Sequence, residues 1–137
     1  MNFHIDVVSL NGQIYSGDVV KVILPSIDGE MTVLAKHMPI IAPIGLGEIV
    51  VETPDNVLNL SVGKGVFEFS QGHARLLIED VTSADEISEE NALEAKKRAE
   101  ELLTKGIAGE EKLAALYNLR KSLVDLKIVR RRKKRIL

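Results

Sequence analysis

The residues best suited to chemistry in this sequence are three histidines and three pairs of adjacent glutamates. A histidine serves as a metal ligand or general base when a second ligand or an acid–base partner accompanies it. His4, His37 and His73 are each isolated in the sequence, and the chain contains no cysteine. The glutamate pairs stand in helix-like segments, where carboxylates are typical of a solvated face: Glu89-Glu90, Glu100-Glu101 and Glu110-Glu111. The sequence therefore predicts neither catalytic residues nor a metal site.

Two glycine motifs could be mistaken for phosphate-binding loops. Such a loop requires glycines that open a helix, because the helix N-terminus supplies the donors for phosphate. Here "GLGEIVV" and "GKGVFEF" lead into strand-like segments, and no G-x-S-x-G nucleophile motif occurs. We therefore expect a protein that is not an enzyme.

The strongest charge feature is an unbroken run of six basic residues at positions 130–135 in a chain of net charge −2. Residues 1–84 carry a net charge of −6, residues 85–111 carry −5, and residues 112–137 carry +9. Like charges repel when gathered in one segment, so such an arm implies a negative partner. The candidates are nucleic acid, an anionic membrane and an acidic protein.

Length and composition are those of an ordinary globular protein. The chain has 137 residues, of which 45% are hydrophobic and 28% charged. No apolar stretch approaches the roughly 20 residues that cross a bilayer, and the N-terminus lacks the features of a signal peptide. Absence of cysteine suits a reducing compartment. We expect a soluble, cytoplasmic protein.

The first part of the chain, residues 1–84, has the pattern of an all-β domain. Short alternating or β-branched runs are separated by turn residues such as Asn11-Gly12 and Asp28-Gly29, and an apolar strand is expected after Pro39. Seven further runs read as strands: "FHIDVVS", "VVKVIL", "MTVLA", "EIVVE", "VLNLSV", "VFEFS" and "ARLLIE". Many short strands at regular spacing predict an antiparallel β-sandwich or flattened barrel.

Residues 85–137 change to a helical period. Ser88 is a candidate N-cap, and alanines then recur at three- and four-residue spacing. "TKGIAGEE" breaks the pattern before a second helix with a predicted leucine seam: Leu113, Leu116, Leu119, Leu123 and Leu126. This predicts an antiparallel two-helix hairpin. Because alanines bury little apolar area, the hairpin should have a thin stability margin and be able to unfold or redock.

Taken together, these segments resemble the epsilon subunit family of the bacterial F-type ATP synthase (delta in mitochondria). The resemblance covers essentially the whole chain. It is carried by the order and spacing of five segments: "HIDVVSLNGQIYSGDVVKVILP", "DGEMTVLAKHMPII", "GLGEIVV", "SVGKGVFEF" and "ALEAKKRAEELL". The family fold, a β-sandwich followed by a helical hairpin, agrees with the fold predicted above from periodicity.

The resemblance implies a non-catalytic subunit of the rotor stalk, held peripherally at the cytoplasmic face of the bacterial cell membrane. In the family the sandwich binds the gamma subunit and rests on the ring of c subunits, so it couples ion flow to rotation. Glu30 would then face the c ring, while His37, Met38 and Ile40 would face gamma. The C-terminal helices of the family extend toward the alpha and beta subunits and block ATP hydrolysis.

The resemblance also implies a use for the basic arm. The family's catalytic beta subunits present an acidic helix-turn-helix toward the stalk. We expect residues 120–135 to form or extend a basic helix whose cations meet that surface: Arg130, Arg131, Arg132, Lys133, Lys134 and Arg135.

The chain departs from the family at the start of the hairpin. Some members bind ATP there through an I/L-D-x-x-R-A motif, and this chain has Ser88 and Asn91 in place of the aspartate and arginine. Arg98 is the remaining cation. We therefore expect no cofactor and weak or absent ATP binding. Lys36 and Thr32 also replace common glycines, so the local backbone can differ.

Two alternatives remain from the residues alone. A small nucleic-acid-binding or adaptor protein would use the basic arm as a clamp, but the rest of the chain is acidic and only 4% of residues are aromatic. A membrane-surface helix would need a continuous apolar face beside the basic one, and the run at 130–135 has few apolar neighbours. We expect neither nucleic acid nor direct membrane binding.

Overall fold

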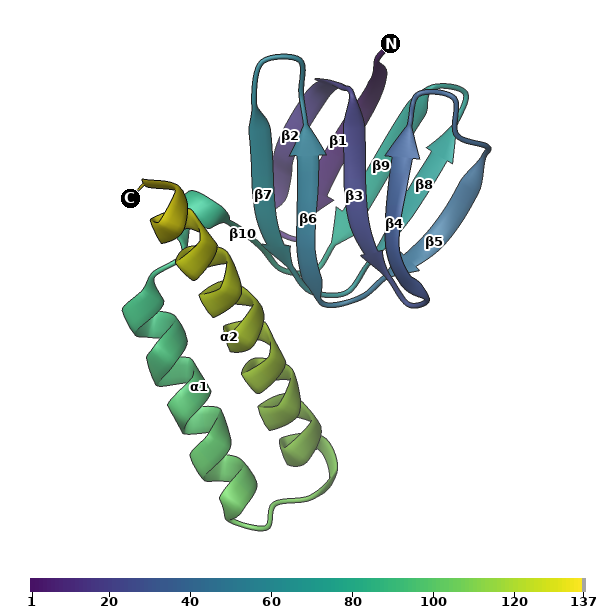
Figure 1. Cartoon of the computed structure of the whole chain (residues 1–137). Helices are drawn as coiled ribbons and strands as arrows, with labels where there is room; N and C mark the ends of the chain where they lie inside the picture. The colour runs from purple at the N-terminus through teal and green to yellow at the C-terminus, as the bar shows by residue number, and fades with distance from the viewer. Residues whose placement is uncertain (137) are drawn as a thin grey trace. The chain divides into compact units, whose positions relative to one another are not determined.

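A computed structural model of the chain describes the backbone of residues 1–136 and the side chains of residues 1–132. The chain forms two compact units, residues 1–83 and 84–137, which divide one residue before the expected boundary (Figure 1). Neither helix contains the long uncharged apolar stretch that a bilayer-spanning helix needs within the described residues.

The first unit consists of ten strands, and the second holds a short 3₁₀ helix and two α-helices. The strands are β1 (Phe3–Ser9), β2 (Gly12–Val19), β3 (Lys21–Ser26), β4 (Gly29–Leu34), β5 (Ile40–Ile44), β6 (Gly47–Glu52), β7 (Val57–Val62), β8 (Gly65–Ser70), β9 (His73–Ile78) and β10 (Val81–Ser83). The helices are η1 (Ala84–Glu86), α1 (Glu89–Thr104) and α2 (Gly109–Ile136).

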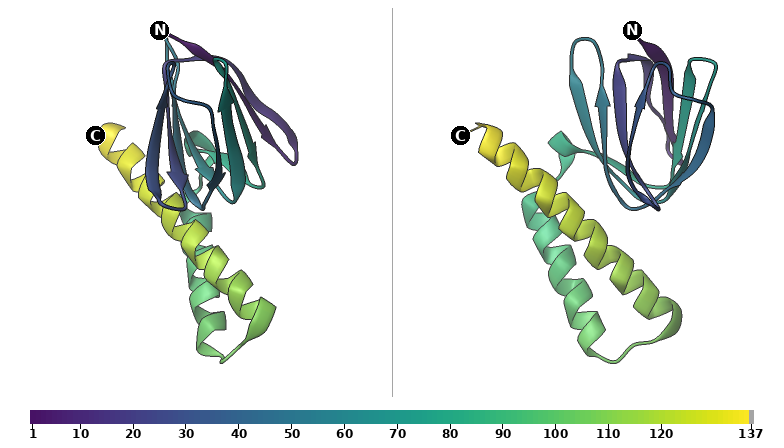
Figure 2. Two further views of the ribbon diagram at one scale, coloured as in Figure 1. Left: turned by 90° about the vertical axis from the view of Figure 1, so that its right-hand side faces the viewer. Right: turned by 45° about the vertical axis from the view of Figure 1, so that its right-hand side comes forward.

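The strands hydrogen-bond in the order β10-β7-β6-β3-β5-β8-β9-β1-β2, and β4 pairs with β3. β3 and β5 share a single residue pair, Ser26 with Ile44. Because they meet only there, the sheet folds into two layers that face each other (Figures 1 and 2). The predicted fold class is confirmed. One pairing differs from the antiparallel expectation, since β1 and β9 run parallel.

The core of the sandwich lies between the two layers. Alternate side chains point inward, as in β1, where Phe3, Ile5 and Val7 are buried. Phe3 also meets Phe69 edge-on, with ring centroids 5.4 Å apart. A sheet with one solvated face requires alternation of this kind. The same alternation in the sequence is what predicted these strands.

Gly65 marks a close approach of backbone at the start of β8. A Cβ atom at this position would clash with the carbonyl oxygen of Leu77 on β9, and it would lie 3.2 Å from the Cα of Ile78. Only a residue without a side chain fits between these strands. The glycine was predicted as part of a turn, and its role is to let the first residue of β8 pair with Ile78, the last residue of β9.

The sequence missed two strands, β2 and β10. β2 has the sequence "GQIYSGDV", with little apolar alternation, and it is the last strand of the sheet. An edge strand buries few side chains, so its pairing with β1 comes from the backbone rather than from a hydrophobic pattern. β5, expected as a buried strand, is only half-buried: Ala42 and Ile44 face the core, while Ile41 and Pro43 are exposed.

In the second unit α1 and α2 form the predicted antiparallel hairpin (Figures 1 and 2). Ser88 is the N-cap of α1, since the backbone N–H of Asn91 donates to its Oγ at 3.2 Å. The predicted leucine seam is only partly correct, because Leu126 is buried but Leu113 and Leu123 are 67% and 47% exposed. The buried residues of α2 are Ala115, Ser122, Leu126, Ile128 and Val129, and those of α1 are Ala92 and Ala99.

Small side chains explain the shifted seam. Alanines on α1 allow a close approach only if the opposing residues of α2 are small as well, and Ala115 and Ser122 are. Ser122 avoids an unsatisfied buried hydroxyl by donating to the carbonyl of Leu119 at 2.8 Å. The sequence pattern favoured leucines over the smaller residues that in fact make the contact.

Candidate interaction sites

Glu30 is the second residue of β4 and is exposed beside the hairpin turn that joins β3 to β4. The Ser26 hydroxyl donates to the carbonyl of Gly29 at 2.6 Å, which fixes the turn. Ile27 beside it is 73% exposed. This end of the sandwich therefore offers to solvent an apolar side chain on a short, hydrogen-bonded turn and a carboxylate on the strand beside it.

The opposite end of β4 leads to His37 and Met38. The His37 ring lies edge-on to Phe69 at 6.2 Å, and its Nδ1 is 2.8 Å from the carbonyl oxygen of Met38. These contacts fix the loop, and the Met38 side chain is 70% exposed. Because β4 separates them, Glu30 and His37 lie at opposite ends of the sandwich.

The exposed apolar residues near Met38 are not all those that the sequence predicted. Ile40 is half-buried and packs against the sandwich core. Its neighbour Ile41 is 74% exposed, and Leu34 at the end of β4 is also exposed. The sequence missed both, although the alternation of β5 places residues 40 and 41 on opposite faces. We call Leu34, Met38 and Ile41 the apolar loop surface.

A second apolar area lies on the outer face of the layer that contains β1, β8 and β9. Val8 and Val66 both pair with Leu77 in adjacent strands, so their side chains form a row. With Leu10 and other residues around it, this row lines a shallow hollow of about 520 Å³. The sequence pattern did not reveal this hollow, because its residues come from three separate strands.

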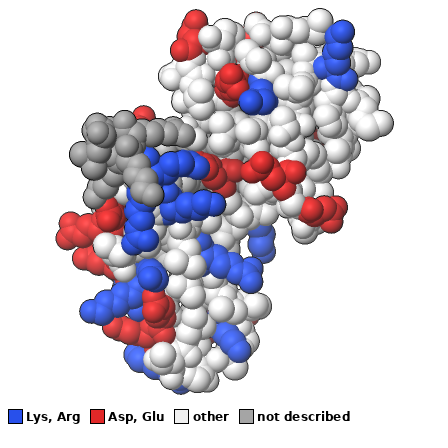
Figure 3. Space-filling view, viewed as in Figure 1, with Lys and Arg blue, Asp and Glu red and all other residues white. Residues whose placement is uncertain are grey.

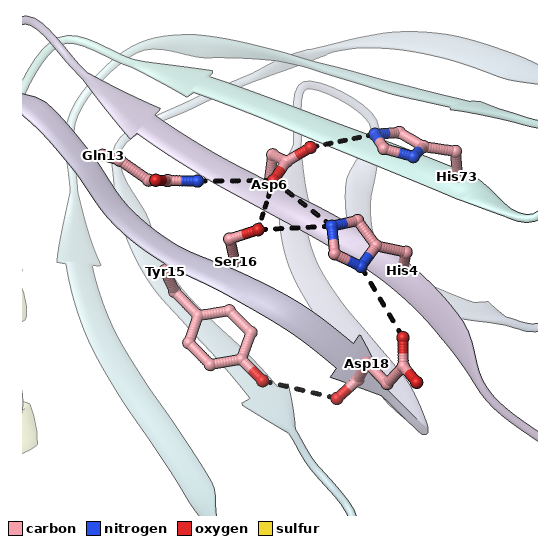
Figure 4. A network of polar contacts seen from close by, with 7 residues as sticks. All are labelled: His4, Asp6, Gln13, Tyr15, Ser16, Asp18 and His73. Atoms are coloured by element: carbon pink, nitrogen blue, oxygen red, sulfur yellow. Dashed lines mark hydrogen bonds and ion pairs between the residues drawn. The ribbon is translucent and has the colours of Figure 1, made fainter.

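A polar cluster occupies the same outer face near the other ends of these strands (Figure 4). Asp6 is at its centre. Its Oδ1 accepts from the Ser16 hydroxyl at 2.6 Å and lies 3.3 Å from His4 Nε2, and its Oδ2 lies 3.0 Å from His73 Nε2. Gln13 also donates to Asp6, at 3.4 Å. The cluster joins β1 to both of its neighbours.

The Ser16 hydrogen bond lowers the pKa of the Asp6 carboxyl, and His4 and His73 add to this effect against partial desolvation. Partners on three strands satisfy the hydrogen-bonding capacity of the Asp6 carboxylate. This is typical of a polar cluster that stabilises strand pairing. Among the described side chains, no group of three His, Asp or Glu residues is placed to hold a metal ion. The two histidines looked isolated in sequence, and the parallel pairing of β1 and β9 brings their rings to 5.1 Å.

In the hairpin unit, cations surround a groove between α1 and α2. Lys96 of α1 and Lys127 and Arg130 of α2 border it, and Leu123 lies among them, in a volume of about 390 Å³. In the space-filling view, Lys and Arg side chains gather on the upper part of the hairpin, whereas the visible face of the sandwich is mostly uncharged (Figure 3).

The weak nucleotide candidates Ser88, Asn91 and Arg98 lie at the N-cap of α1 or along that helix. The hydroxyl of Ser88 is used as the N-cap of α1. Asn91 and Arg98 are exposed on α1, and neither borders the cationic groove.

The basic arm is helical, since α2 runs without a break to Ile136 and includes residues 120–135. Its cations differ in environment: Arg130 is exposed, while Arg131 and Arg132 are half-buried. The Arg132 guanidinium donates to the carbonyl oxygens of Ala84 and Ile87. The side chains of Lys133, Lys134 and Arg135 lie outside the described residues.

Comparison with known proteins gives a consistent family. The model of the family described as "ATP synthase, Delta/Epsilon chain, beta-sandwich domain" matches residues 2–84. The ATP synthase epsilon chain of Ruthia magnifica is 31% identical over 92% of this chain and 91% of its own length. The epsilon chain 1 of Methylococcus capsulatus is 32% identical over 93% and 91%.

Solved structures agree in fold. A chain in the Euglena gracilis mitochondrial ATP synthase matches with a TM-score of 0.78 at 16% identity, covering 87% of this chain and 76% of that one. A chain from the Tetrahymena thermophila enzyme, in a structure of its central stalk and c ring, matches at 0.59 with 10% identity over 93% of each chain. The matches to the sandwich and to full-length relatives show that this chain belongs to the ATP synthase delta/epsilon chain family.

Proposed function

We propose that this rotor-stalk subunit of an ATP synthase is non-catalytic, transmits ion-driven rotation through its sandwich, and restrains ATP hydrolysis through its C-terminal helices. The observation that carries the proposal is that the two units of the chain differ in packing and in the surfaces they expose. An apolar-cored sandwich has distinct surfaces at its two ends, and a thinly packed hairpin carries the cations. The subunit is held peripherally, at the cytoplasmic face of the cell membrane, through the complex.

The two ends of the sandwich serve two partners. Glu30 and its turn contact the polar loops of the c ring, and the apolar loop surface with His37 contacts gamma. Opposite placement along β4 supports two separate partners, because one flat surface could not cover both ends. Three exposed apolar side chains in one loop region are also the kind of surface that a partner covers.

A matched pair of substitutions tests this assignment. Met38→Glu should weaken binding of isolated gamma, because it places a charge in an apolar contact, whereas Ile27→Glu at the other end should leave gamma affinity unchanged. Ile27→Glu should instead reduce assembly with the c ring. Equal gamma affinity for both variants would contradict the assignment of the two ends. Ile40 is a poor choice for this test, since it packs against the core.

The cationic groove and arm meet acidic surface on the alpha and beta subunits. Lys127 and Arg130 border the groove and are exposed in the described hairpin. Each exposed ion pair contributes only about 0.2–1 kcal/mol, so several pairs are needed to hold a subunit interface, and salt weakens them.

The test is ATP hydrolysis by the assembled complex at low salt. Replacing Lys127 and Arg130 by alanine should raise hydrolysis without loss of assembly. Lys112→Ala, in the first turn of α2, is the matched control and should have no effect. Deletion of residues 127–137 is a less clear test, because Ile128 and Val129 are buried in the hairpin core. An unchanged rate in the double variant would contradict inhibition by this surface.

Weak or absent ATP binding by the isolated subunit completes the proposal. Its support is that the Ser88 hydroxyl is engaged as a cap and that Asn91 offers no charge to phosphate. Calorimetry that gave a dissociation constant of about 10 μM or tighter, near −7 kcal/mol, would contradict it.

A further inference from the structure

Arg132 makes hydrogen bonds within the hairpin, whereas Arg130 of the same basic arm is exposed. The Arg132 guanidinium reaches back to the segment that leads into α1, where Nη1 donates to the carbonyl of Ala84 and Nη2 donates to that of Ile87 at 3.3 Å. Ala84 belongs to η1, and Ile87 lies directly before the N-cap Ser88. One side chain near the end of α2 thus binds the first and the last residue of the segment 84–87, which leads into the hairpin.

An apolar cluster joins the same two segments. Ile87 from the entry segment and Ile128 and Val129 from α2 are 5%, 2% and 0% exposed. Ala84 and Val124 pack against them. We call residues 84–87 the entry segment. Polar and apolar contacts therefore close the hairpin at one place, where its first residues meet the end of its last helix.

The residue type fits this task. A guanidinium presents its donors as a rigid planar fork, so it can bond two carbonyls at once, whereas an ammonium is a point charge. Backbone carbonyls are neutral acceptors. A carboxylate binds the same guanidinium more strongly in a charge-assisted pair. A carboxylate-bearing surface can therefore compete with Ala84 and Ile87 for Arg132.

We infer that Arg132 is a latch that fastens α2 to the entry segment and that must release before α2 can leave the hairpin. The inference deepens the proposed function and rests on it for its regulatory part: the cation that closes the hairpin becomes available to an acidic partner once the latch opens. Arg132 then differs from Arg130, which is exposed and is available to a partner without such a release.

The first test uses the isolated full-length protein and amide hydrogen exchange. Arg132→Lys keeps the charge and loses the fork, and Arg132→Gln loses the charge as well. Loss of one hydrogen bond from a charged group should speed exchange of the Ile87 amide, which is bonded to Ala84, by roughly tenfold. The matched control Arg130→Lys should leave it unchanged. Equal exchange in all three variants would overturn the latch.

The second test separates the latch from the proposed function. In the assembled complex, Arg132→Lys should lower ATP hydrolysis, since it frees α2 and retains a cation for the partner. Arg130→Ala should raise hydrolysis, so the two substitutions act in opposite directions. If exchange responds as expected but neither variant changes hydrolysis, the latch stands and the inhibitory role is contradicted. If Arg132→Lys raises hydrolysis as Arg130→Ala does, Arg132 is a partner contact and the regulatory inference is overturned.

Discussion

The sandwich and the hairpin are stabilised by different means. Among the described residues, the sandwich core gathers 17 buried side chains, including Phe67 and Leu76, whereas the hairpin cluster holds three. Apart from Leu126, the hairpin adds only buried alanines and one serine, which bury little apolar area per residue. Burial scales with apolar area at about 25 cal/mol per Å², so the sandwich should have much the larger margin.

The largest expected effect tests the margin of the sandwich. Phe67→Ala removes a fully buried aromatic side chain and should cost about 3–5 kcal/mol of unfolding free energy, because it leaves a cavity between the layers. Urea unfolding followed by residue-resolved amide signals would measure it, with Phe67→Leu as the milder control. Signals from α1 and α2 that shift by the same amount would mean that the two units unfold together. That result would contradict separate stability margins for the sandwich and the hairpin.

The next effect tests the small-residue seam of the hairpin. Ala115→Leu forces a larger side chain against α1 and should cost about 1–3 kcal/mol. Ala114→Leu is the matched control, since Ala114 is exposed at the adjacent position of the same helix. Thermal unfolding of the hairpin signals distinguishes them. If both variants behave alike, the helices are not in close contact at this seam.

A smaller effect is expected at the start of α1. Ser88→Ala removes the cap hydroxyl that accepts from Asn91 and should cost about 1 kcal/mol of hairpin stability, with the sandwich unaffected. Ser88→Asp keeps an acceptor and should restore most of the loss. Exchange rates of the first amides of α1 give the measurement. A cost shared equally by sandwich amides would contradict independent units.

The smallest effect concerns the pH response of the sandwich. The pKa of Asp6 is lowered in the folded protein, mainly by Ser16. A depressed carboxyl pKa stabilises the fold above the ordinary unfolded value of about 3.9, and this contribution is lost as pH falls through the folded pKa. Asp6→Asn should therefore destabilise the sandwich at pH 7 and have little effect in strong acid.

The control for that experiment is Asp55→Asn, in the exposed turn between β6 and β7. Denaturant unfolding at several pH values between 7 and the acid limit compares the two variants. A loss in Asp6→Asn that is independent of pH would show that the carboxylate charge plays no part and that only the shape of the side chain matters.

Several features of this protein can be predicted from the sequence alone. The strand period up to residue 79, the helical period after residue 85, the Ser88 cap and the concentration of positive charge at residues 112–137 are local patterns. Local patterns reflect which side chains face the core and which backbone angles a residue tolerates, and both are set within a few positions of the chain. The order of the motifs was sufficient to predict the family as well.

Other features depended on the tertiary structure because they join residues far apart in the chain. The pairing of β1 with β9 brings His4 and His73 to one carboxylate, and the row of Val8, Val66 and Leu77 needs three strands. The register of the hairpin seam depended on how closely two helices approach, which periodicity does not encode. Arg132 was one of six similar cations in sequence, and only the folded entry segment, 45 residues away at Ile87, distinguishes it.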